Sequence, residues 1–140
     1  MIKRIVVALL ILVMMSATVI TAQETDKEKI AIATAEKWLA VVDGGQYAES
    51  WREAASYFRT SVTQEQWKHS LTAVRKPLGR LLSRKMKDKK YLTSLPGAPD
   101  GEYLVIQFET SFANKKSAIE TVTPMREKDG KWRVSGYYIN

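Results

Sequence analysis

The first half of the chain repeats its apolar positions at the three- and four-residue spacing of an amphipathic helix. This pattern predicts three helices. Capping-box sequences at 25–28 and 63–66 mark the starts of the first and third helices. Gly44-Gly45 is expected to stop the first helix, because glycine adopts a left-handed cap without steric cost. Apolar positions at 47, 51, 54, 55 and 58 predict a continuous second helix, and Pro77 ends the third.

The second half alternates apolar and polar positions with a period of two, which is typical of strands with one buried face. The predicted strands are 81–95 with a bulge or twist, 103–112, 117–128 with an interruption at Pro124, and 131–139. In the last strand the pattern places Trp132, Val134, Gly136 and Tyr138 on one face. Asp129-Gly130 predicts a hairpin turn. Because the helices precede the strands, the fold class is α+β, with three helices packed on a curved four-stranded antiparallel meander.

The first 22 residues have the three parts of a cleavable signal peptide. Lys3-Arg4 precedes an apolar run over 5–15, and small residues lead to an expected cleavage after Ala22. An uncleaved N-terminal anchor is the alternative, because residues 5–22 carry no charge and reach the lower limit of a membrane span. We therefore expect a periplasmic or secreted protein with a single domain over 23–140 and no stable span after cleavage.

Composition removes several kinds of chemistry. The chain has no cysteine, which excludes thiol catalysis and thiolate metal sites, and its one histidine, His69, falls off the apolar stripe of its helix. No metal site and no cofactor are expected. The formal net charge is +7, and residues 68–90 carry nine basic side chains against one acidic side chain. Nucleic acid is not an expected partner of an exported protein.

Several short motifs along the predicted mature chain resemble an exported bacterial family known as domain of unknown function 4019. They are Glu36-Lys37-Trp38-Leu39, Asp43-Gly44-Gly45-Gln46-Tyr47, Ser50-Trp51, Thr93 to Gly97, Phe112 to Lys115 and Trp132 to Tyr138. The resemblance implies no activity. The helix stop before Tyr47 and Trp51 is also similar to the opening of the nuclear-transport-factor-2-like cone folds, which implies helices inside a curved sheet. That fold hosts isomerases, dehydratases and binding modules, and homodimers through the outer sheet face are common in it.

Two strand carboxylates are candidate catalytic groups. The resemblance to cone-fold isomerases implies an acid in an apolar pocket, and Glu109 or Glu120 could supply it. Glu109 lies on the face opposite Phe108, whereas Glu120 shares a face with Ala118 and Val122. The alternative is that both acids lie on the solvated face, because a buried unpaired carboxylate is costly.

Two further sets of residues are candidate binding groups. Aromatic side chains at core spacing would either fill the interior or line a pocket for a small apolar ligand. They are Trp38, Tyr47, Trp51, Trp67 and Phe108. Cations of the basic segment would either protect an edge strand or bind an anionic envelope component. They are Arg75, Lys76, Arg80, Arg84, Lys85 and Lys87.

The sequence thus favours an exported, non-enzymatic binding or interaction domain. One alternative is a small isomerase- or dehydratase-like enzyme with a carboxylate in a cone pocket. The other is a module whose basic strand docks on an anionic envelope surface.

Overall fold

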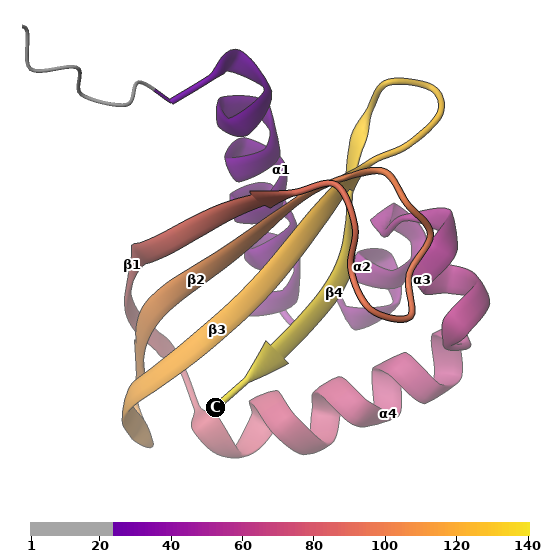
Figure 1. Cartoon of the computed structure of the whole chain (residues 1–140). Coiled ribbons are helices and arrows are strands. Elements are labelled where there is room, and N and C mark those ends of the chain that lie inside the picture. The colour runs from indigo at the N-terminus through magenta and orange to yellow at the C-terminus, as the bar shows by residue number, and fades with distance from the viewer. Residues whose placement is uncertain (1–23) are drawn as a thin grey trace, which may run out of the picture.

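The computed structural model describes residues 24–140, so the predicted signal peptide lies outside the described residues. Four α-helices and a short 3₁₀ helix precede four strands (Figure 1). The helices are α1 (Asp26–Asp43), α2 (Tyr47–Glu53), α3 (Ser56–Ser61), α4 (Gln64–Arg75) and η1 (Lys76–Leu78). The strands are β1 (Leu81–Leu92), β2 (Glu102–Phe112), β3 (Lys115–Arg126) and β4 (Trp132–Ile139). Within residues 24–140, no helix has the length and apolar character that crossing a membrane requires.

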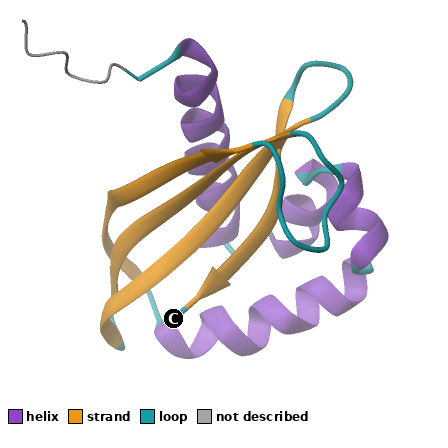
Figure 2. Ribbon diagram, in the orientation of Figure 1, coloured by secondary structure: helices purple, strands orange, loops and turns teal. Residues whose placement is uncertain are grey.

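The predicted α+β class and the antiparallel meander are confirmed. The strands follow one another across the sheet in the order β1-β2-β3-β4, and every neighbouring pair is antiparallel. The sheet curves around the helices, with α1 along its concave face and α4 across one end (Figure 2). Both predicted capping boxes form, at Thr25 and at Thr63.

The prediction of one continuous second helix is wrong, because the chain breaks between α2 and α3. Ala54 and Ala55 take extended backbone conformations, with ψ of 164° and 150°. The Ala55 amide donates to the Val134 carbonyl of β4 at 2.8 Å, and both alanines are buried. This tertiary hydrogen bond and the close approach that small side chains permit outweigh the high helix propensity of alanine.

The predicted buried face of β4 is correct only for its first half. Thr123 pairs with Gly136 and Pro124 with Val134, which leaves Ser135 as an extra residue in a bulge. Pro124 has no amide to donate to the ladder, so an irregularity is expected here. The bulge resets the alternation, and Tyr138 is 55% exposed while the neighbouring Tyr137 turns toward the core.

Tryptophan and phenylalanine side chains fill the space between the helices and the sheet. Trp38 packs at a centroid distance of 6.2 Å from Trp67, and both lie in one cluster with Phe108. The two indole N–H groups are satisfied by Ser50: Trp38 donates to its carbonyl at 2.8 Å and Trp67 to its hydroxyl at 3.0 Å. Of the two alternatives for these aromatic side chains, they therefore mainly fill the interior.

Candidate functional site

Glu120 of β3 lies at the centre of a buried polar cluster. Its side chain has no exposed surface. Arg84 of β1 donates to both carboxylate oxygens, at 2.7 and 3.1 Å, and the Thr110 hydroxyl of β2 donates at 2.6 Å. The Tyr137 hydroxyl of β4 donates to the same carboxylate. Each of the other three strands thus contributes a side chain to this carboxylate, and the alternative of a solvated Glu120 is wrong.

A second carboxylate extends this cluster from the sheet to the helices. Asp43, the last residue of α1, accepts from Arg84 at 2.7 and 2.9 Å. It also accepts from Arg75, in the last turn of α4, at 2.8 Å. We call these six residues the buried network. Its members are Asp43, Arg75, Arg84, Thr110, Glu120 and Tyr137.

The charges of the buried network balance, with two guanidinium groups facing two carboxylates. Burial would raise the pKa of Asp43, but hydrogen bonds from Arg84 and Arg75 outweigh it and hold the pKa below its ordinary value. Burial would lower the pKa of Arg84, but its hydrogen bonds to Asp43 and Glu120 raise it further above its ordinary value. The pKa of Tyr137 is raised by burial, and then by the negative charge and hydrogen bond of Glu120. Tyr137 therefore stays a protonated donor.

Arg75 is the least saturated member of the buried network. Only 6% of its surface is exposed, and its guanidinium lies 4.9 Å from the Phe112 ring centroid. Its Nε and Nη1 atoms have no hydrogen-bond partner among the described residues. The face of Phe112 offers partial compensation through a cation–π contact.

The geometry decides what Glu120 can do chemically. A general base needs a free lone pair within reach of a substrate proton. The carboxylate of Glu120 instead accepts four hydrogen bonds from three side chains, and the Arg84 fork covers both of its oxygens. Glu120 therefore has a structural role: it binds Arg84, and Arg84 in turn binds Asp43, which connects the sheet to α1.

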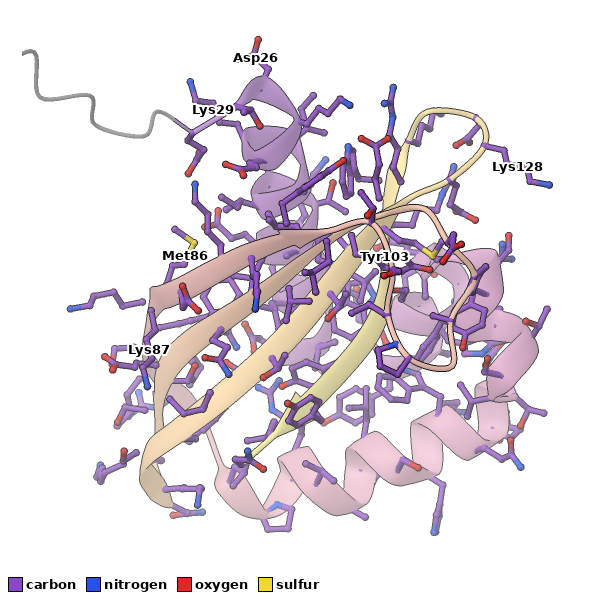
Figure 3. The ribbon with its side chains drawn as sticks, in the orientation of Figure 1. Asp26, Lys29, Met86, Lys87, Tyr103 and Lys128 are labelled. Carbon is purple, nitrogen blue, oxygen red and sulfur yellow. The ribbon has the colours of Figure 1, made fainter. Side chains whose placement is uncertain are left out.

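The other predicted acid, Glu109, lies on the exposed outer face of the sheet. It pairs across the strands with Lys85, and both line an open hollow of about 600 Å³. Lys87 and, from β3, Lys116 line the same hollow. Lys87 points away from β1 toward solvent (Figure 3).

The six candidate cations of the basic segment do not all lie on the surface. Arg75 is buried and Arg84 is half-buried, because the acids Asp43 and Glu120 pair with them inside the fold. Lys76, Arg80, Lys85 and Lys87 are exposed.

The aromatic candidates are mostly core. Trp38, Trp67 and Phe108 are buried, while Tyr47 and Trp51 are partly buried against the same cluster. Three of them also line open hollows. Trp38 lines a hollow between α1 and β4, Tyr47 lines one beside α2, and Trp67 lines a groove between α4 and β4. His69 is exposed, and no cluster of three potential metal ligands occurs within residues 24–140.

Sequence reasoning did not find Tyr137, Asp43 or Thr110 as members of a polar cluster. In the sequence Asp43 only precedes the Gly44-Gly45 helix stop, and strict alternation in the last strand puts Tyr137 on the face opposite Trp132. The available signal was the presence of a proline in β3, Pro124, and a glycine in β4, Gly136. Both flank the bulge that turns Tyr137 inward.

The fold is that of a cone-shaped α+β domain, and ion pairs of the buried network lie between its sheet and its helices. A solved structure supports this class. The chain is similar to the crystal structure of a proposed ketosteroid isomerase from Shewanella frigidimarina NCIMB 400, with a TM-score of 0.51 and 16% identity. The match covers 79% of this chain and 94% of that chain. At this identity the likeness concerns the fold alone.

The family is established by a second comparison. The model of the family described as Protein of unknown function (DUF4019) matches residues 34–137. The chain belongs to this family. No curated protein matches the sequence.

Proposed function

We propose that this chain is an exported, non-enzymatic domain that binds a small apolar ligand in the groove between α4 and β4. The absence of catalysis is proposed because the hydrogen-bonding capacity of the Glu120 carboxylate is fully used by Arg84, Thr110 and Tyr137. The other candidate acid, Glu109, lies in solvent on the opposite face. Neither acid has the free, enclosed position that proton abstraction requires.

The groove between α4 and β4 is mainly apolar. It has a volume of about 210 Å³ and is lined mainly by apolar side chains of α4 and of the last residues of β4. Val74 and Tyr138, at its rim, are 46% and 55% exposed. Ligand sites for drug-sized molecules span about 300–1,000 Å³, so this groove suits a smaller molecule.

The floor of the groove is fixed by the buried network. Tyr137 lines the groove and donates its hydroxyl to Glu120. Its ring also packs edge-on against Trp38 at a centroid distance of 5.3 Å. Because both the hydroxyl and the ring of Tyr137 are already held in place, this side chain loses little conformational entropy when a ligand binds, which favours affinity for a small ligand.

N-phenyl-1-naphthylamine, a small neutral apolar dye, tests the groove. We expect its fluorescence to rise on binding to the mature protein, and Val74→Glu to abolish this rise by placing a charge at the rim. The matched control is Ile30→Glu, because Ile30 is equally aliphatic, 57% exposed and located on α1. Equal dye binding by both variants, or no binding by the unmodified protein, would contradict the proposal.

Catalysis is tested separately. The reaction to assay is isomerisation of a steroid ketone, the activity for which the Shewanella relative is named. We expect no turnover above a buffer control. Turnover that disappears in Glu120→Gln but persists in Glu109→Gln would establish the enzyme alternative instead.

The exported location is also a proposal. It rests on the leader pattern over 1–22. N-terminal sequencing of the protein expressed in a bacterial host should return a chain that begins at Gln23 and fractionates with the periplasm. A chain that begins at Met1 in the membrane fraction would support the anchor alternative.

A second candidate function uses the outer face of β1. Lys85 and Lys87 of β1 line one hollow together with Lys116 of β3, so three positive charges lie around this hollow. An anionic lipid surface would be attracted to this face. The ordinary alternative is protection of an edge, since β1 is an outer strand of the sheet.

Vesicle binding separates these two interpretations. Lys85→Glu with Lys87→Glu should remove binding to phosphatidylglycerol vesicles if the face docks on lipid. The control, Lys29→Glu with Lys37→Glu, makes the same charge change on exposed positions of α1. Equal loss in both double variants, or aggregation without loss of binding, would leave edge protection as the role of these lysines.

A further inference from the structure

Four arginines from four different elements line one hollow at the end of β4 opposite the groove. They are Arg52 of α2, Arg59 of α3, Arg126 at the end of β3 and Arg133 near the start of β4. The hollow is open and has a volume of about 810 Å³. The charge pattern along the chain gave no sign of this cluster, because the basic excess lies in residues 68–90.

The break between α2 and α3 lies against the hairpin that borders the hollow. The hydrogen bond from Ala55 to Val134 fixes the break against β4, and the Ser56 amide donates to Glu127 of the β3–β4 hairpin at 3.1 Å. Arg52 of α2 and Arg59 of α3 flank this break, and both line the hollow.

Two of the three acids that line the hollow are already paired, and the third, Asp100, is exposed to solvent. Glu127 and Asp129 bind Arg133 at 2.7 and 3.0 Å. Burial would raise the pKa of Glu127, but hydrogen bonds from Ser56 and Arg133 hold it below its ordinary value. A hydrogen bond from Arg133 likewise lowers the pKa of Asp129. Both acids therefore stay ionised and remain with Arg133.

The other three arginines keep donors available. Among the described residues, Arg59 donates only to the Ser56 hydroxyl, at 3.3 Å. Arg52 uses Nε and Nη2 on Glu49, which leaves Nη1. Arg126 uses Nη1 on Glu102 and Nε on the Gly130 carbonyl, which leaves Nη2. Lys128 lies on the β3–β4 hairpin (Figure 3). With it, the lining holds five cationic and three acidic side chains.

We propose that this arginine hollow binds the phosphate group of a phosphomonoester. Guanidinium groups that approach from α2, α3 and β3 suit a tetrahedral oxyanion, which accepts hydrogen bonds from several directions. A planar carboxylate would satisfy only one such fork. The phosphate group belongs either to a small soluble molecule or to a lipid headgroup.

Calorimetry with pyrophosphate and inorganic phosphate provides the first arm, and vesicles that contain phosphatidic acid provide the second. In the arm that binds, Arg52→Gln with Arg59→Gln should weaken affinity by about tenfold or more, since each substitution removes a charge-assisted hydrogen bond. Lys85→Gln with Lys87→Gln removes the same charge from the outer face and should change affinity less than about twofold.

The outcomes are distinct. Binding of free phosphate or pyrophosphate identifies a soluble ligand, and binding of phosphatidic acid vesicles alone identifies a lipid headgroup. The proposal fails if neither arm binds, or if both double variants weaken binding equally. Both arginines are exposed, so we expect unchanged thermal midpoints, and Arg52→Lys with Arg59→Lys should restore only part of the affinity because lysine lacks the guanidinium fork.

Discussion

Replacement of Glu120 by glutamine tests the buried network most directly. The substitution keeps the shape of the side chain but removes its charge and turns one acceptor oxygen into a donor. That new donor meets the hydrogen-bond donors of Arg84, Thr110 or Tyr137. Removing one partner of a buried ion pair typically costs about 3–5 kcal/mol, because the other charge is left uncompensated.

Two structural features set the size of the expected loss. Glu120 is completely buried, which favours a large effect. Arg84 keeps two hydrogen bonds to Asp43, at 2.7 and 2.9 Å, which places the effect toward the lower end. We expect the free energy of unfolding to fall by about 3 kcal/mol, a large share of the roughly 5–15 kcal/mol of a domain. The thermal midpoint should fall by about 10 °C or more.

Urea denaturation followed by tryptophan fluorescence measures this loss. Glu109→Gln is the matched control, because Glu109 is exposed on the outer face and its loss should stay within about 0.5 kcal/mol. Tyr137→Phe should cost about 1.5–3 kcal/mol alone and less when combined with Glu120→Gln, since both remove the same hydrogen bond. Equal, small losses for Glu120→Gln and Glu109→Gln would refute the account of the network.

Three further predictions follow from the core and its turns. The pKa of Asp43 is lowered in the folded protein, so the stabilising effect of Asp43 is complete above the unfolded pKa of 3.8 and is lost as the pH falls below that value. The free energy of unfolding, measured between pH 5 and 2, should therefore decline less steeply in Asp43→Asn than in the unmodified protein. Gly79→Ala should lower the thermal midpoint more than Gly97→Ala, because both have positive φ but only the new Cβ at Gly79 would meet a neighbour, at 3.0 Å. Ser50→Ala should cost about 1–3 kcal/mol in urea denaturation by leaving the Trp67 indole N–H unpaired, and an unchanged midpoint would contradict this.

The sequence predicted the elements well where a local pattern decided the structure. The stripe from Ala31 to Val42 and the alternation from Tyr103 to Phe112 are strong periodic signals, and both elements form as expected. The break at Ala54-Ala55 had no local signal, because alanine favours helix. A hydrogen bond to a strand about 80 residues away decides that break.

The candidate site was predictable in one half only. The shared face of Ala118, Glu120 and Val122 is a local property of β3, and of the two alternatives that it left open for Glu120, the inward one is found. Its partner Arg84 lies 36 residues earlier, and only the strand registers and the bulges bring the two together. No spacing rule within one strand predicts such a partner, so Arg84 was grouped with the exposed lysines that follow it.

The buried network explains why the working surfaces of this domain are expected at its ends. Four charges from α1, α4, β1 and β3 meet under the sheet and neutralise one another. A charged ligand placed there would have to displace a paired arginine or carboxylate, which would leave an uncompensated buried charge. The same contacts instead fix Tyr137 at one end of β4, while Ala55 is fixed near the other. A rigid interior therefore presents two differently built surfaces, an apolar groove over Tyr137 and an arginine hollow beside Arg133, and the two proposed ligands can be tested independently.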